Sequence, residues 1–149
     1  MLREHSKISL DFLGQQIGLK DCSPSFIRNF VGSNHLEKIL DAICPTERDD
    51  LKKRKYITVD VFEKQYTKGE RTCKDIDWHV DGKSNIYFMY QLGENRTEFQ
   101  EFGEIAPGIL YEYDSESVHK GRDVQIPGRR MMIRLCFSDY ISHRNKRFY

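Results

Sequence analysis

The stretch RRMMIRLCFS, residues 129–138, decides the fold, because its side chains separate into two sets when they alternate along a strand. The apolar set is Met131, Ile133, Leu135 and Phe137, and the other set is Arg130, Met132, Arg134, Cys136 and Ser138. Successive side chains of a strand point to opposite faces of a sheet. One face therefore packs into a core, while the other presents two guanidinium groups. Cations inside a fold are costly unless an anion meets them, and a guanidinium fork matches a carboxylate.

Several shorter strands are expected before this one. Residues 85–92, NIYFMYQL, form an apolar run that is short enough for a buried strand. Turn signals at 107–108 and 127–128 bound a segment in which apolar and aromatic residues alternate. The stretches YITVDVF (56–62) and SFIRNFV (25–31) are rich in β-branched and aromatic residues. These signals predict a mainly β fold, a sandwich or barrel of short strands.

One amphipathic helix is expected near the N-terminus. Asn34 followed by Glu37 resembles a helix start, and apolar residues then recur at helical spacing until Pro45. The mixed-charge run TERDDLKKRK, residues 46–55, is either a solvated loop or the exposed face of a helix. The helix would support the β-structure.

Size and charge limit the class of protein. The 149 residues, 38% of them hydrophobic, suit a single compact domain spanning residues 1–149. Charged residues make up 32% but nearly cancel to a net charge of +1, which gives no electrostatic support for a large nucleic-acid or acidic-membrane footprint. No stretch approaches the roughly 20 apolar residues of a membrane-spanning helix. The start lacks the apolar block of a secretory signal.

The four cysteines are widely spaced and include no C-x-x-C pair. We therefore expect reduced, mostly buried thiols in a cytoplasmic protein, rather than a disulfide framework or a zinc site.

The segment WHVDG, residues 78–82, carries the chemistry. His79 and Asp81 are two residues apart, so on a strand both project from the same face and can reach one ion. An imidazole nitrogen and a carboxylate oxygen suit Fe(II), and a set of two histidines and one carboxylate leaves open positions for substrates. His119, in the polar segment SESVHKGR, is the best candidate for the second histidine. A structural histidine that hydrogen-bonds Asp81 would give the same motif.

The order His-x-Asp, distal histidine and then arginine on the following strand resembles the Fe(II)/2-oxoglutarate-dependent oxygenases, with the phytanoyl- and prolyl-hydroxylase-like branches nearest. FIRNFVGSNHLEKILDAI (26–43) looks like the family's opening strand and supporting helix. PGILYEYDSESVHKG (107–121) looks like its turn, strand and histidine, and GRRMMIRLCFS (128–138) like its closing strand. The resemblance covers roughly residues 26–140. It implies a double-stranded β-helix, a jelly-roll or cupin-like fold, with one or two N-terminal supporting helices.

The resemblance also implies roles for particular residues. His79, Asp81 and His119 would be the iron ligands and the catalytic centre. Arg130 is the first choice for the distal carboxylate of 2-oxoglutarate, with Arg134 as partner or substitute. Weaker candidates for cosubstrate contacts, for which ordinary strand packing is the alternative, are Tyr87 and Ser138. The reaction would hydroxylate an unidentified substrate and release succinate and CO₂; a metabolite or a protein side chain is favoured over a nucleobase.

Two other functions remain open from the sequence. A cupin-like metalloenzyme would use the same ligands without 2-oxoglutarate, and it would not need Arg130 and Arg134. A non-catalytic β-domain of an assembly would use His79 and His119 for structure alone, and Fe(II) would then not stabilise the fold.

Overall fold

The computed structural model describes residues 1–5, 26–29, 49–54, 56–72, 76–82 and 85–139. Within these residues the fold is mainly β, with a single short helix, α3 (Asp49–Lys52). The strands are β1 (Arg3–His5), β2 (Phe26–Asn29), β3 (Tyr56–Tyr66), β4 (Ile86–Gly93), β5 (Glu98–Phe99), β6 (Gly103–Glu104), β7 (Leu110–Asp114), β8 (His119–Lys120) and β9 (Gly128–Ser138). The mainly β fold expected from the sequence is confirmed.

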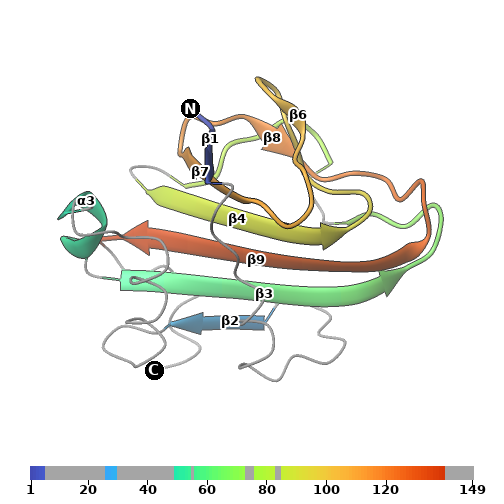
Figure 1. The fold of residues 1–149 in the computed structure, drawn as a ribbon, viewed down its shortest axis with the longest axis horizontal. Helices are drawn as coiled ribbons and strands as arrows, with labels where there is room; N and C mark the ends of the chain where they lie inside the picture. Colours follow the sequence, from blue (N-terminus) through green and yellow to red (C-terminus); the bar gives the residue numbers. More distant parts are fainter. Residues whose placement is uncertain (6–25, 30–48, 55, 73–75, 83–84, 140–149) are drawn as a thin grey trace.

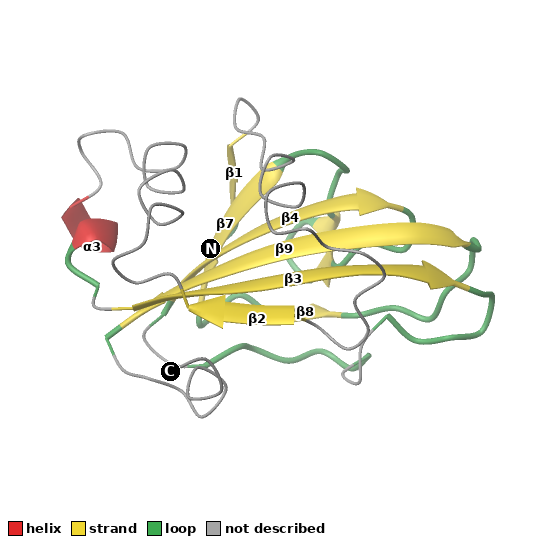
Figure 2. Ribbon diagram, turned by 90° about the horizontal axis from the view of Figure 1, so that it is seen from below, coloured by secondary structure: helices red, strands yellow, loops and turns green. Residues whose placement is uncertain are grey.

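The strands form two antiparallel sheets. Six strands make a large sheet in the order β1-β7-β4-β9-β3-β2, and three short strands make a small sheet in the order β6-β5-β8. In Figure 1, β4, β9 and β3 run side by side across the molecule, and β6 and β8 of the small sheet lie above β4 in this view. Figure 2 shows the strands of the large sheet fanning apart, as the twist between neighbouring strands requires.

The strand pairing in the region from β3 to β9 is nested. The strands in the second half of this region pair, in reverse order, with those in the first half. The outermost pair is β3 with β9, and next comes an isolated bridge between His79 and His119. The pair β4 with β7 follows, and β5 with β6 is innermost. Additional pairing of β4 with β9 and of β5 with β8 joins these pairs into the two sheets. The nesting brings His79 beside His119 although they are far apart in the sequence.

At its central strands β4, β7 and β9 the large sheet is largely buried on both faces. Tyr87 and Tyr113 are cross-strand partners, and they pack in one core cluster with Phe99 of the small sheet. We call the face of the large sheet that bears Tyr87 and Tyr113 the inner face. The opposite face carries side chains that are each at most 2% exposed: Phe88, Tyr90, Leu110, Ile133, Leu135 and Phe137.

The two central strands agree with the sequence patterns. Alternation along β9 separates the buried Ile133, Leu135 and Phe137 from Arg134, as the pattern of residues 129–138 predicts. The apolar run at 85–92 forms β4, which is buried over most of its length.

The outer strands and the helices agree in part. β2 falls within the strand predicted at 25–31, whereas β3 continues to Tyr66, past the predicted end at residue 62, because β9 offers pairing partners along its full length. The predicted helix after Asn34 lies outside the described residues. α3 falls in the charged run at 46–55, where a loop or helix face was expected, and its Leu51 is buried.

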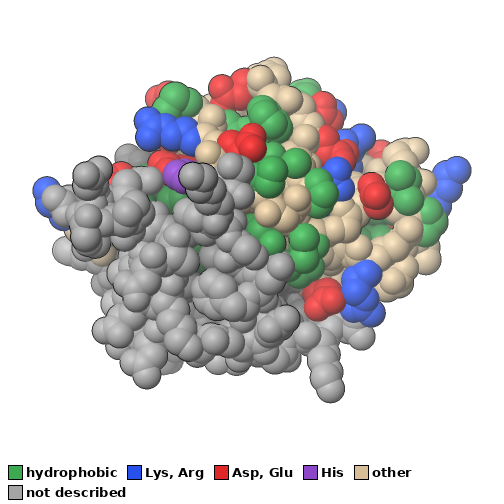
Figure 3. Space-filling view, viewed as in Figure 1, with side chains coloured by type: hydrophobic (Ala, Val, Ile, Leu, Met, Phe, Trp, Pro, Cys, Tyr) green, Lys and Arg blue, Asp and Glu red, His purple; other side chains and the backbone are tan. Residues whose placement is uncertain are grey.

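The described surface is of mixed charge. Figure 3 shows acidic and basic side chains interspersed on the face in view, in keeping with the net charge of +1. No helix in the part of the chain that the structure describes has the length and apolar character needed to cross a lipid bilayer.

Candidate metal centre

A backbone bridge brings the two histidines together. His79 and His119 each donate a backbone N–H to the other's carbonyl oxygen at 2.9 Å. Their imidazole rings lie edge to face, with centroids 4.6 Å apart. Around His79 the side chains alternate as in a strand: His79 and Asp81 are partly buried, whereas Trp78 and Val80 are exposed. The expectation that His79 and Asp81 share a face is therefore confirmed.

Both imidazoles are oriented by a carbonyl oxygen two residues earlier in the chain. His79 Nδ1 lies 2.8 Å from the carbonyl oxygen of Asp77, and His119 Nδ1 lies 2.8 Å from that of Ser117. Because a carbonyl oxygen only accepts, each Nδ1 carries a proton and donates it. Each ring therefore keeps its Nε2 for the site, and this second interaction fixes the tautomer as it does in known metal centres.

Asp81 receives contacts from three directions. Its Oδ2 accepts a hydrogen bond from the Tyr113 hydroxyl at 3.0 Å and lies 3.4 Å from the Arg134 guanidinium. The Nε2 of His119 lies 3.3 Å from the same oxygen. Burial alone would raise the pKa of the Asp81 carboxyl, but the hydrogen bond from His119, the charge of Arg134 and the Tyr113 hydroxyl together hold that pKa well below its usual range. The carboxylate is therefore ionised and ready to meet a cation.

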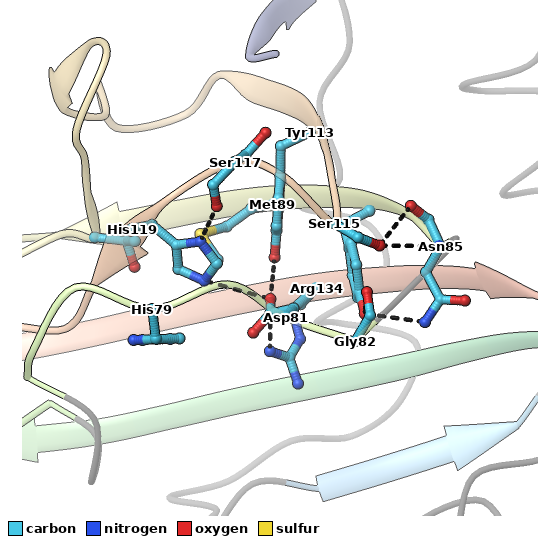
Figure 4. A network of polar contacts seen from close by, with 12 residues as sticks. His79, Asp81, Gly82, Asn85, Met89, Tyr113, Ser115, Ser117, His119 and Arg134 are labelled. Atoms are coloured by element: carbon cyan, nitrogen blue, oxygen red, sulfur yellow. Dashed lines mark hydrogen bonds and ion pairs between the residues drawn. The ribbon is translucent and has the colours of Figure 1, made fainter.

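The three side chains converge on one point. One ligand atom from each of His79, Asp81 and His119 lies within 4.8 Å of the others, so the group can hold a metal ion (Figure 4). Two neutral imidazoles and one carboxylate are the donor set of mononuclear iron, manganese and related centres. The donor chemistry fits Fe(II).

Aromatic rings shelter the centre from solvent. Phe99 and Tyr113 pack against the His119 ring with centroid distances of 5.1 and 5.3 Å, and His119 is only 3% exposed. Removal of water from such a site strengthens every electrostatic interaction within it.

The two arginines of β9 occupy different places on the inner face. Arg134 contacts Asp81 and therefore lies beside the candidate metal centre. Arg130 is four residues away on the same face, which corresponds to about 13 Å along a strand, and it is 4% exposed. The structure thus brings Arg134 to the three metal-site residues and places Arg130 farther along the strand.

The two weaker candidates are also buried. Tyr87 stacks on Tyr113 with a centroid distance of 5.0 Å, and its hydroxyl donates to the carbonyl oxygen of Gly82 at 3.5 Å. Burial raises the pKa of Tyr87 above its usual value, so the hydroxyl stays protonated. Ser138 is the last residue of β9 and is 3% exposed. Tyr87 therefore belongs to the surroundings of the site, while Ser138 lies at the end of the strand.

Tyr113 is the residue that sequence reasoning missed. Its alternation with Tyr111 indicates a strand, but nothing in that pattern shows that its hydroxyl reaches Asp81. The carbonyl oxygens of Asp77 and Ser117 were also missed, because any residue can supply a backbone carbonyl. Their common signal is position, two residues before each histidine.

Comparison with known protein families gives no matching family model, and none of the curated proteins matches this chain.

Proposed function

We propose that this chain is an Fe(II)/2-oxoglutarate-dependent oxygenase built on a double-stranded β-helix. His79, Asp81 and His119 bind the iron, and an arginine of β9 binds the cosubstrate. A metabolite or a protein side chain is the substrate to be hydroxylated.

The nested strand pairing supports the double-stranded β-helix. Eight extended segments run from β3 to β9 when the His79 segment is included, and the first pairs with the last, the second with the seventh, and so on inward. A long hairpin that is wrapped into two facing sheets produces this order, and the jelly rolls and cupins are built in this way. Here His119 belongs to β8 of the small sheet, and Tyr113 and Arg134 reach Asp81 from the inner face of the large sheet.

The observation that carries the proposal is the use of both Nδ1 protons. Because these protons are donated to the carbonyl oxygens of Asp77 and Ser117, the Nε2 atoms are left for the site that they share with the Asp81 carboxylate. The His119 Nε2 already lies 3.3 Å from the Asp81 carboxylate, and a divalent metal would meet both Nε2 atoms and this carboxylate at once. A structural contact between His119 and Asp81 would not require the second imidazole, that of His79, to converge on the same point.

The arginines support a dicarboxylate cosubstrate. Arg134 already contacts a metal ligand, so it lies beside the part of 2-oxoglutarate that binds the iron. Arg130 is buried farther along the same face, and its guanidinium fork suits a carboxylate. We therefore keep Arg130 as the anchor, and Arg134 as its partner near the metal.

Bound iron with 2-oxoglutarate and dioxygen supplies hydroxylation coupled to oxidative decarboxylation, with succinate and CO₂ as products. The chain's own residues orient the metal ligands and exclude water. The two carbonyl oxygens hold the imidazoles, Arg134 and Tyr113 hold the carboxylate, and Phe99 helps to exclude water from the site.

Anaerobic addition of Fe(II) and 2-oxoglutarate tests the proposal. We expect a visible metal-to-ligand charge-transfer band in the wild type and none in Asp81→Ala, because that variant lacks the anionic ligand. Arg130→Ala is expected to weaken 2-oxoglutarate binding by about 100-fold, since a charge-assisted bidentate contact is worth roughly 3 kcal/mol, while iron binding is retained. Arg129→Ala is the matched control, because Arg129 is exposed and pairs with Glu63 at 3.3 Å.

Two outcomes would contradict parts of the proposal. Iron binding without the band would favour a cupin-like centre that does not use 2-oxoglutarate. If Arg134→Ala abolished the band while Arg130→Ala left it unchanged, the anchor would be Arg134.

A further inference from the structure

The segment that carries His79 and Asp81 is the outermost strand of the small sheet. This sheet has the order β6-β5-β8, and the bridge between His79 and His119 adds the segment beside β8. Within the part of the chain that the structure describes, no strand pairs with the other side of the segment. The segment therefore presents an open strand edge, which we call the 78–81 edge.

The 78–81 edge offers backbone groups for further pairing. His79 uses its own N–H and C=O in the bridge to His119. In an antiparallel pair, the residues on either side of such a hydrogen-bonded residue direct their N–H and C=O away from the partner strand. Trp78 and Val80 therefore direct these groups away from β8, and none of the described residues bonds to them. An extended peptide supplies the matching donors and acceptors.

The side chains on the outer face of this edge also suit a partner. Trp78 is 42% exposed and Val80 is 50% exposed, so both offer apolar surface. The Lys120 ammonium lies 4.4 Å from the centroid of the Trp78 ring, and its contact with the Glu98 carboxylate is long, at 3.8 Å. Because that ion pair is loose, the positive charge of Lys120 complements an acidic side chain in a partner. The outer face therefore matches a peptide that carries apolar and acidic side chains.

We propose that the 78–81 edge binds an extended peptide as an additional antiparallel strand, and that the peptide residue opposite His79 is the one presented to the metal centre. Every strand pair among the described residues is antiparallel, which favours this direction. The inference deepens the proposed function by naming an extended peptide as the substrate, and it rests on that function for the reaction.

Strand geometry decides where each peptide side chain goes. Side chains that lie opposite each other across a pair project to the same face, and successive ones alternate. The residue opposite His79 therefore projects to the face that carries His79 and Asp81, which Figure 4 shows on the segment beside His119. Its two neighbours lie beside Trp78 and Val80 on the outer face. The residue opposite His79 forms a non-hydrogen-bonded pair, with Cα atoms about 4.5 Å apart, so docking does not use its N–H.

An array of short random peptides, blocked at both ends, tests the inference on the chain without added metal. Trp78 is the single tryptophan of the chain, so its fluorescence reports occupation of the edge directly. We expect a subset of peptides to shift this emission. We then expect N-methylation along a bound peptide to alternate in effect. At either residue beside the presented one it should lower affinity by about tenfold, the value of one hydrogen bond, and at the presented residue it should be tolerated.

Val80→Pro tests the same contact from the side of the protein. Proline removes the outward N–H of residue 80, and affinity for a bound peptide should fall by about tenfold. Val80→Ala is the matched control, because it keeps that N–H, and it should lose less affinity than the proline variant. If Val80→Pro did not fold, the N-methylation series on the wild type would decide alone.

Three outcomes would overturn the inference. They are no peptide that shifts the Trp78 emission, N-methylation effects that do not alternate, and a dimer of this chain that Val80→Pro dissolves, which would give the edge to a second copy. Peptide binding needs neither iron nor 2-oxoglutarate. Binding without the charge-transfer band would therefore contradict the oxygenase and keep the peptide site, whereas the band without peptide binding would contradict the peptide site alone.

Discussion

Asp81 is a mostly buried carboxylate that remains ionised because its neighbours offset the cost of burial. Its side chain is 15% exposed, and isolated burial would favour the protonated form. His119, Arg134 and Tyr113 each favour the charged form instead. In the metal-free chain the His119 Nε2 lies 3.3 Å from the Asp81 carboxylate, and a bound metal would contact both groups. The site therefore has its negative charge in place before the metal arrives.

Asp81 should make the stability of the metal-free protein depend on pH in acid. Its pKa in the folded chain lies below the ordinary aspartate value of 3.8, so its contribution is fully present above that value. The contribution is lost as the pH falls through the lower, folded pKa. We expect Asp81→Asn to be less stable than wild type at neutral pH, with a difference that shrinks below about pH 4.

Urea unfolding in the presence of a chelator, at neutral and acid pH, measures this difference. Asp123→Asn is the control, because Asp123 has an exposed side chain at the surface. A stability difference for Asp81→Asn that stayed constant down to acid pH would contradict the expected dependence.

At the level of elements, the end of β4 fits against the start of β9 through a glycine. Gly93 has a φ of +90°, and a Cβ at this position would lie 2.2 Å from the carbonyl oxygen of Arg129. Just beyond it, Asn95 accepts the backbone N–H groups of Gln125 and Ile126 through Oδ1 and donates to the Ile126 carbonyl. These contacts hold the turn before β9 against the end of β4, and so they help to set the place of Arg130.

Replacing Gly93, with Gly69 as the control, separates the energetic cost of steric overlap from the cost of the strained backbone conformation. Gly93→Ala is expected to destabilise the fold by about 3 kcal/mol or more, because the strained φ and the overlap add together. Gly69→Ala is the matched control, since Gly69 has a φ of +91° but nothing within 4 Å of the added Cβ. It should cost only about 1 kcal/mol. Equal losses in urea unfolding would show that the close approach of β4 and β9 does not matter.

For the whole molecule, the candidate metal centre lies where the two sheets meet. His119 belongs to β8 of the small sheet and pairs with His79, whereas Tyr113 and Arg134 reach Asp81 from the large sheet. A metal ion bound there adds a further link between parts of the chain that are distant in sequence. Binding to the folded state alone must therefore stabilise the fold.

Thermal unfolding measures how much a bound metal stabilises the fold. At a free metal concentration of 100 times Kd, the fold gains about 2.7 kcal/mol, which for a chain of this size raises Tm by roughly 5–10 °C. We expect this rise with Fe(II) under anaerobic conditions, and we expect its loss in His119→Ala. His5→Gln should keep the full rise, because His5 pairs with Glu112 outside the site. No rise in the wild type would favour a non-catalytic β-domain.

The sequence by itself determined the local features of this protein. Alternation in residues 129–138 and the apolar run at 85–92 predicted two central strands, because side-chain direction in a strand repeats every two residues. The same rule predicted that His79 and Asp81 share a face. These features depend on neighbours in the chain, and a pattern of residue types records them directly.

Only the tertiary structure decided which distant residues meet. It paired His79 with His119, aimed the Tyr113 hydroxyl at Asp81, and placed Arg134 rather than Arg130 beside that carboxylate. Each of these contacts depends on strand order and on pairing register. Many orders and registers are compatible with the same alternating pattern, because alternation fixes the face of a side chain but not its partner across the sheet.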